Sequence, residues 1–291
     1  SVRVWQQIVA RHPDNVGAYE ALACAQAAAG DPDAAARSVA QLVQRSPTAE
    51  GHLAAMRVCH RLRRTDAAIA HGRKAVELAQ SGQREDYRLQ LAALCLEAGH
   101  TNEARALYEV ASRSEAEAAR KAGCRGLLHA VAALGEAELA KLASSRLADR
   151  TFSAERLTET CALLREQYAD MDKLDALATL IEAAAPGSPH PAVLWRELAR
   201  VRRDCGQPLQ ALEALEKAAP LALGDYDVQR DLAELALQHG RRELAAAALA
   251  RTIELRPEAA YNYVRLAGLY IQMQRAQDAA TLAELAVRRV V

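Results

Sequence analysis

The chain has 291 residues, of which 51% are hydrophobic and only 4% aromatic, and alanine is its most abundant residue. This composition favours closely packed helices and excludes an all-β or α/β fold, because alanine is the best helix former and strands are rich in aromatic and β-branched residues. Lys plus Arg and Asp plus Glu number 37 each, so the formal net charge is zero and a dedicated nucleic-acid binder is disfavoured. The sequence also contains no apolar run as long as a membrane span, which predicts no direct membrane insertion.

A turn followed by an amphipathic helix recurs along the chain at a nearly constant period. The clear turns begin at Gly30, Arg63, Gly99, Gly135, Gly206, Gly240 and Gln274. Successive starts are 33, 36, 36, 71, 34 and 34 residues apart, so the gap of 71 predicts one degenerate repeat centred near residues 168–173. Glycine at five of the seven turns fits a helix that ends in the left-handed conformation, which glycine adopts at little cost.

Each repeat also carries small and apolar residues at fixed places. In every clear repeat an alanine lies five residues after the start of the turn. A methyl group at this position lets the two paired helices approach closely. These alanines are Ala35, Ala68, Ala104, Ala140, Ala211, Ala245 and Ala279. The helix before the turn carries apolar anchors at helical spacing, as in Tyr19, Leu22, Ala23; Trp195, Leu198, Ala199; and Tyr263, Leu266, Ala267, Tyr270. Prolines close several repeats, at Pro13, Pro47 and Pro257.

These residues together resemble the signature of the tetratricopeptide repeat, a 34-residue helix-turn-helix unit. Repeats at 16–47, 192–219, 226–257 and 260–288 resemble it well, those starting near 49, 85 and 121 moderately, and 153–185 by position only. The resemblance implies an all-α fold, a right-handed superhelical solenoid of about eight antiparallel helix-turn-helix repeats over residues 1–291.

Three stretches are expected along this solenoid: N-terminal repeats at 1–150, a degenerate repeat and hinge at 151–191, and C-terminal repeats at 192–291. The middle stretch ends in the Pro/Gly/Ser cluster APGSPHP. Because this stretch matches the repeat pattern poorly, we expect it to have few apolar contacts and low local stability. Because VRVWQQIVARHP fits a second helix and AVRRVV lies inside another repeat, we expect the sequence to be an excerpt of a longer repeat protein.

The sequence contains no constellation of catalytic or metal-binding residues. Phosphate-binding glycine loops, the nucleophile elbow GxSxG and the HExxH motif are absent, and no two histidines lie three or four residues apart. Cys59 and His60 are adjacent and so point about 100 degrees apart on a helix. We therefore predict no catalytic residue, metal or cofactor and no enzyme activity. The six cysteines include no CxxC pair, which predicts free thiols in a cytoplasmic protein; the alternative is the periplasmic part of a membrane-anchored export protein.

In the repeat family the first helix of each repeat lines a concave groove that binds partners. Arg196, Arg200 and Arg203 lie at i, i+4 and i+7 and so share one helix face. The predicted groove residues are Arg196, Arg200, Arg203, Arg230, Arg265 and Tyr261, with a second cluster of Arg57, His60 and Arg61. Guanidinium groups bind carboxylates in a bidentate way, so these residues predict a site for an acidic peptide. The alternative is that neighbouring carboxylates neutralise the arginines: Glu197, Asp204, Asp227, Asp231 and Glu234.

The function that the sequence favours is a non-catalytic protein-protein interaction scaffold that binds a peptide or helical segment of a partner. Family members with such arrays act in larger bacterial-type assemblies for exopolysaccharide synthesis and export, secretion or group transfer. Two known specialisations of the family, the clamp that binds a partner's C-terminal carboxylate and the asparagine ladder of sugar transferases, both need asparagines in the groove. This sequence has asparagine only at Asn15, Asn102 and Asn262, which lie at turns or repeat boundaries, so both specialisations are disfavoured. Two alternatives are a helical-repeat RNA binder, which the zero net charge disfavours, and the regulatory half of an enzyme whose catalytic domain lies outside this sequence.

Overall fold

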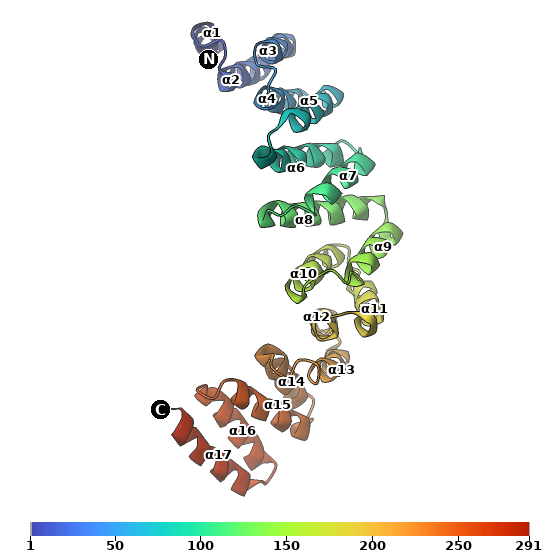
Figure 1. The fold of residues 1–291 in the computed structure, drawn as a ribbon, viewed down its shortest axis with the longest axis vertical. Helices are drawn as coiled ribbons and strands as arrows, with labels where there is room; N and C mark the ends of the chain where they lie inside the picture. Colours follow the sequence, from blue (N-terminus) through green and yellow to red (C-terminus); the bar gives the residue numbers. More distant parts are fainter. Residues whose placement is uncertain (1, 291) are drawn as a thin grey trace. The chain divides into compact units, whose positions relative to one another are not determined.

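The computed structural model describes residues 2–290 as seventeen α-helices and one short 3₁₀ turn, with no strand in that range (Figure 1). Within each of the two compact bodies of the chain consecutive helices pair as antiparallel hairpins, so the predicted all-α helical repeat fold is confirmed. The chain divides into two compact bodies, residues 1–139 and 140–291, and each body is described separately.

The N-terminal body contains α1 and three and a half hairpins. Its helices are α1 (Val2–Arg11), α2 (Val16–Ala28), α3 (Pro32–Arg45), α4 (Ala49–Arg61), α5 (Thr65–Leu78), α6 (Ser81–Glu97), α7 (Thr101–Ala111) and α8 (Glu117–Leu134), and α9 (Glu136–Leu147) runs across the boundary. The side chains of Asn15, Asp31 and Thr48 cap α2, α3 and α4 by accepting from backbone N–H groups. Within this body α2 contacts α4 and α6 contacts α8, so first helices of neighbouring hairpins lie side by side (Figure 1).

The C-terminal body contains four hairpins. Its helices are α10 (Ala154–Asp170), α11 (Leu174–Ala184), the 3₁₀ turn η1 (Ala185–Gly187), α12 (Pro191–Asp204), α13 (Pro208–Ala218), α14 (Tyr226–Gln238), α15 (Arg242–Leu255), α16 (Ala260–Gln272) and α17 (Ala276–Arg289). First helices are again neighbours: α10 contacts α12, and the Tyr226 hydroxyl of α14 lies 3.4 Å from Asn262 Oδ1 of α16.

Every hairpin turn contains one residue in the left-handed region of backbone space. Five are the predicted glycines, with φ between 70° and 127°: Gly30, Gly99, Gly135, Gly206 and Gly240. At the other turns Arg63 and Asp172 have φ 56° and Gln274 has φ 60°. Asp172 therefore marks the turn of the degenerate repeat, 37 residues after Gly135 and 34 before Gly206. The hairpin geometry is kept where the glycine is missing, at the cost of backbone strain.

The small residue after the turn is buried in six of the seven predicted places. Ala35, Ala68, Ala104, Ala211 and Ala245 have no exposed surface, and Ala279 is buried. The prediction of Ala140 is wrong, because Ala140 is only half-buried while Leu139 is fully buried. The reason is that α9 begins directly after Gly135, whereas the other glycine turns have one more residue before the helix. A turn shorter by one residue moves the buried position by one residue.

The degenerate repeat has a regular core despite its faded signature. Leu157, Leu164 and Tyr168 of α10 and Leu177 and Ile181 of α11 are almost completely buried. The expectation of few apolar contacts is therefore wrong for this hairpin, since leucines replace the usual anchors and alanine. In the proline-rich connection that follows, His190 Nε2 lies 3.1 Å from the Phe152 carbonyl oxygen. The hinge at 151–191 stays a prediction.

Candidate functional site

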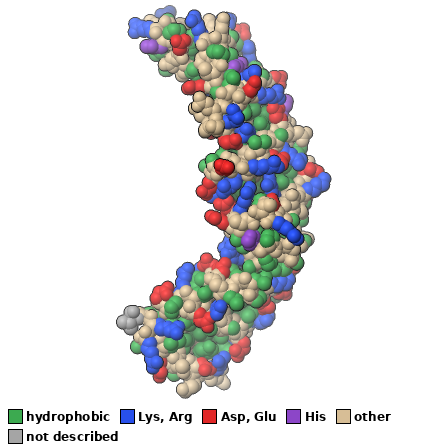
Figure 2. Space-filling view, viewed as in Figure 1, with side chains coloured by type: hydrophobic (Ala, Val, Ile, Leu, Met, Phe, Trp, Pro, Cys, Tyr) green, Lys and Arg blue, Asp and Glu red, His purple; other side chains and the backbone are tan. Residues whose placement is uncertain are grey.

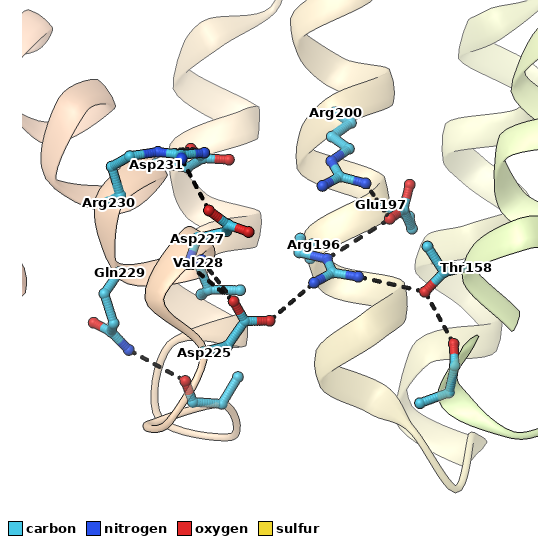
Figure 3. Close-up of polar contacts among 12 residues, drawn as sticks. Thr158, Arg196, Glu197, Arg200, Asp225, Asp227, Val228, Gln229, Arg230 and Asp231 are labelled. Atoms are coloured by element: carbon cyan, nitrogen blue, oxygen red, sulfur yellow. Dashed lines mark hydrogen bonds and ion pairs between the residues drawn. The ribbon is translucent and has the colours of Figure 1, made fainter. Parts of the chain in front are cut away.

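Arg196, in the predicted arginine stripe of α12, connects three helices of the C-terminal body (Figure 3). Its Nη1 donates to Asp225 Oδ2 at 2.9 Å, and its Nη2 donates to Thr158 Oγ1 of α10 at 3.3 Å. Asp225 is also the N-cap of α14, because its Oδ1 accepts from the backbone N–H groups of Asp227 and Val228. Only 17% of the Arg196 side chain is exposed. Arg196 is thus positioned to hold the start of α14 against α12 and α10.

Glu197 is a buried carboxylate beside this arginine. Its side chain is 3% exposed; Oε1 accepts from Arg200 Nη1 at 2.6 Å and lies 3.7 Å from Arg196 Nε. Burial raises the pKa of Glu197, and the positive charges of Arg200, Arg196 and Arg165 act in the opposite direction. Arg200 is therefore engaged with a carboxylate of its own helix.

The remaining stripe residues differ in their surroundings. Arg230 binds two carboxylates of its own helix, Asp227 Oδ1 and Asp231 Oδ1, each at 2.8 Å. Arg203 is exposed, and within residues 2–290 the structure shows no ion pair between it and a carboxylate, because the adjacent Asp204 lies 3.5 Å from Arg165. Arg265 lies over the ring of Tyr261, with Cζ 5.5 Å from the ring centroid. On the face drawn in Figure 2, basic and acidic side chains are interspersed in both bodies. Three of the five predicted arginines thus already have carboxylate partners.

The second predicted cluster, Arg57, His60 and Arg61 of α4, is brought together with the neighbouring first helices. Arg57 Nη1 lies 3.5 Å from Glu20 of α2, and His60 Nε2 lies 3.4 Å from Glu97 of α6. Arg61 Nη1 donates to the Cys24 thiol of α2 at 2.8 Å. Both contacts are long, and the Arg57 and His60 side chains are 44% and 50% exposed, which makes these contacts weak. Arg57, His60 and Arg61 can therefore exchange these partners at little cost.

A cleft of about 340 Å³ lies between α4 and α6 beside this cluster. Met56, Ala93 and Leu94 give it an apolar surface, and the charged and polar lining consists of Arg57, His60, Arg61, Gln90 and Glu97. Of the eight lining residues three are apolar and five are polar or charged, so the cleft combines a small apolar surface with several polar groups. The three predicted residues therefore line one cleft.

A pair of histidines was not predicted from the sequence. His52 of α4 and His71 of α5 have their Nδ1 atoms 3.1 Å apart, which is hydrogen-bond distance. Burial lowers the pKa of both, with further lowering by the charges of Lys74 at His52 and of His52 at His71. They lie 19 residues apart in sequence, so only the hairpin geometry brings them together. Among residues 2–290 no group of three or more His, Cys, Asp or Glu side chains is arranged to hold a metal ion.

The six cysteines are all free thiols. Cys59, Cys95 and Cys161 are buried in the hairpin cores, and burial raises the pKa of Cys95 to about 11. In the described part of the chain, none of the helices has the length and apolar character needed to cross a membrane.

No family model and no curated relative matches the chain. Among solved structures it is similar to the MamA protein, with 14% identity over 72% of this chain and 92% of that chain and a TM-score of 0.39. YrrB, described as a TPR protein with an unusual peptide-binding site, is 15% identical over 75% and 91% of the two chains, with a TM-score of 0.37. A complex of Naa15 and Naa10 bound to HypK gives 18% identity and a TM-score of 0.42; the match covers 98% of this chain and 49% of that one.

These identities and TM-scores are low, so the assignment of the fold depends on the hairpins themselves. The protein is an array of helix hairpins with a left-handed residue at each turn and a small buried residue after most of them. Period, turn and buried alanine together are those of the tetratricopeptide repeat. The chain therefore has a helical-repeat fold of the tetratricopeptide type.

Proposed function

We propose that this protein is a non-catalytic interaction scaffold that binds a peptide or helical segment of a partner along its first helices. The observation that supports this most directly is the cleft between α4 and α6, where an apolar surface meets Arg57, His60 and Arg61. A helical-repeat array presents an extended surface of this kind, and such surfaces bind peptide segments of other proteins.

The lining of the cleft indicates the chemistry of the segment. An apolar side chain fits against Met56, Ala93 and Leu94, and a carboxylate next to it can pair with the guanidinium groups. Arg61 supports this because its partner in the structure is a thiol and not a carboxylate. The segment proposed for this cleft is therefore apolar with an adjacent acidic group.

The arginine stripe of α12 and α14 is the weaker candidate for the same role. Arg196, Arg200 and Arg230 have carboxylate partners, so a ligand would have to displace Asp225, Glu197 or Asp227 and Asp231. Arg203, Arg265 and Tyr261 remain proposed groove residues because they are the stripe members without a carboxylate partner among residues 2–290.

We also propose that the protein acts within a larger assembly of the bacterial types named above, which the family resemblance supports, and that it acts in the cytoplasm, which the six free thiols support. A periplasmic location as part of a membrane-anchored export protein is the alternative.

A random peptide library displayed on phage, selected on the whole protein, tests the proposed site. We expect the selected peptides to combine an apolar residue with a nearby Asp, Glu or chain terminus. The double variant Arg57→Glu, Arg61→Glu should weaken their binding at least tenfold, because each charge-assisted hydrogen bond contributes about 1.5 to 3 kcal/mol. The matched control Arg37→Glu, Arg45→Glu makes the same charge change on exposed positions of α3 and should have no effect. Equal affinity of both variants would exclude the cleft as the site.

A further inference from the structure

A second cleft, of about 610 Å³, lies between the N-terminal half of α6 and the start of α8. Leu89 of α6 and three alanines at the start of α8 give it an apolar surface. Its charged lining residues are Glu85, Asp86 and Glu115, and none of the lining residues in the described part of the chain is basic. Because α6 and α8 already contact each other as the first helices of consecutive hairpins, no further repeat can enter between them. The stacking of repeats therefore leaves this α6–α8 cleft open.

The carboxylates of the α6–α8 cleft are only partly neutralised. Glu85 accepts a hydrogen bond from Arg88 of its own helix. Asp86 accepts from the Gln90 side-chain amide at 2.8 Å, which brings no positive charge. Asp86 and Glu115 are both exposed, and neither forms an ion pair within residues 2–290. Since two of the three negative charges are not compensated, the cleft favours a positively charged group of a ligand.

Helix α6 joins the α6–α8 cleft to the α4–α6 cleft. One face of α6 carries Asp86 of the first cleft and, at i+4, i+7 and i+11, three residues of the second, which are Gln90, Ala93 and Glu97. The 2.8 Å hydrogen bond from Gln90 to Asp86 therefore links a residue of one cleft to a residue of the other. The α4–α6 cleft is lined by two arginines against one glutamate. The two clefts are thus adjacent and opposite in the sign of their charge.

We infer that one segment of a partner protein occupies both clefts and carries an acidic and a basic group in a fixed order. This inference rests on the proposed function, because it takes the α4–α6 cleft as the site for an apolar side chain and a carboxylate. It adds a Lys or Arg side chain of the same segment, which lies in the α6–α8 cleft beside Asp86 and Glu115. A wholly acidic segment is disfavoured, because its continuation along α6 would face uncompensated carboxylates.

The rise of α6 sets the distance between the two charges of the segment. Asp86 and Leu94 line the two clefts and lie eight residues apart, which is about 12 Å along the helix axis. An extended segment advances about 3.3 Å per residue, so its basic residue should lie about four residues from its acidic residue. In a helical segment the same distance corresponds to about eight residues, or two turns.

The test measures how the phage-selected peptides bind to the whole protein and to the variant Asp86→Asn, Glu115→Gln, called the carboxylate variant. Both side chains are exposed, so circular dichroism should be unaltered. We expect the peptides to carry a Lys or Arg at one of these two spacings from their acidic residue, and to bind the carboxylate variant at least fivefold more weakly. Replacing that Lys or Arg by alanine should weaken binding to the unaltered protein but not to the carboxylate variant, since both changes remove the same contact.

The matched control Asp66→Asn, Glu77→Gln removes the same two charges at exposed positions of α5 and should have no effect. Peptides that bind more weakly to the arginine variant of the α4–α6 cleft, but equally well to the carboxylate variant, would overturn the inference and leave the proposed function intact. Selected peptides without a basic residue would do the same. If only the carboxylate variant weakens binding, the segment does not span both clefts, and the proposed α4–α6 site and the inference both fail.

Discussion

Replacing Arg196 by alanine separates a structural role of the arginine stripe from a ligand-binding role. The variant loses the 2.9 Å hydrogen bond to Asp225 and leaves the buried Glu197 with Arg200 as its nearest cation. A charge-assisted hydrogen bond contributes about 1.5 to 3 kcal/mol, and the partial exposure of Asp225 places this one in the lower part of that range. We expect α14 and its contact with α12 to lose about 2 kcal/mol, which multiplies the local opening equilibrium roughly 30-fold.

Amide hydrogen exchange followed by mass spectrometry measures this change helix by helix, which suits a repeat array that does not unfold in a single step. Peptides covering the first turns of α14 should exchange roughly 30-fold faster in Arg196→Ala. Arg203→Ala changes a residue of the same stripe that is exposed and forms no ion pair within residues 2–290, so this variant should leave exchange unaltered. If Arg196→Ala also leaves α14 unaltered, Arg196 does not support the fold, and the arginine stripe becomes the better candidate for binding an acidic partner.

Two further predictions concern stability. Because burial lowers the pKa of His52 and His71, their neutral forms are favoured in the folded protein, so their contribution is complete above about pH 6.5, the ordinary histidine pKa, and is lost as the pH falls below it. In urea titrations between pH 7.5 and 5, the double variant His52→Gln, His71→Gln should lose stability less steeply on acidification; an identical slope would contradict this. At the turns, Gly99→Ala should cost about 1 kcal/mol and Arg63→Gly should gain about 0.5 to 1 kcal/mol, since only the glycine adopts positive φ without strain. A β-carbon added at Gly99 meets nothing within 4 Å, so exchange rates of α6 and α7 that stay the same in Gly99→Ala would refute the backbone explanation.

The period of the turns was sufficient to predict the hairpins, because each turn and its buried alanine are local features of about ten residues. Local spacing failed at Ala140, where a turn shorter by one residue shifts the helix that follows it. The period did locate the turn of the degenerate repeat, since Asp172 lies within the predicted 168–173, although a residue other than glycine adopts the left-handed backbone there.

The candidate sites were predictable only in part, for a related reason. Helical spacing correctly placed Arg196 and Arg200 on one face, but the partners that decide their role include Asp225, 29 residues away. The histidine pair and the contact between Arg61 and Cys24 likewise join residues 19 and 37 positions apart on different helices. A single sequence contains no signal for such contacts, whereas the turns recur at every repeat.

The double use of Asp225 has a consequence for how this sequence can change over evolutionary time. One carboxyl group both starts α14 and binds Arg196. Serine or asparagine can replace an aspartate as a helix cap, but neither carries the negative charge that the arginine needs. Among homologous chains, loss of the acid at 225 should therefore accompany loss of the base at 196, so that the two positions covary although each, taken alone, tolerates several residues.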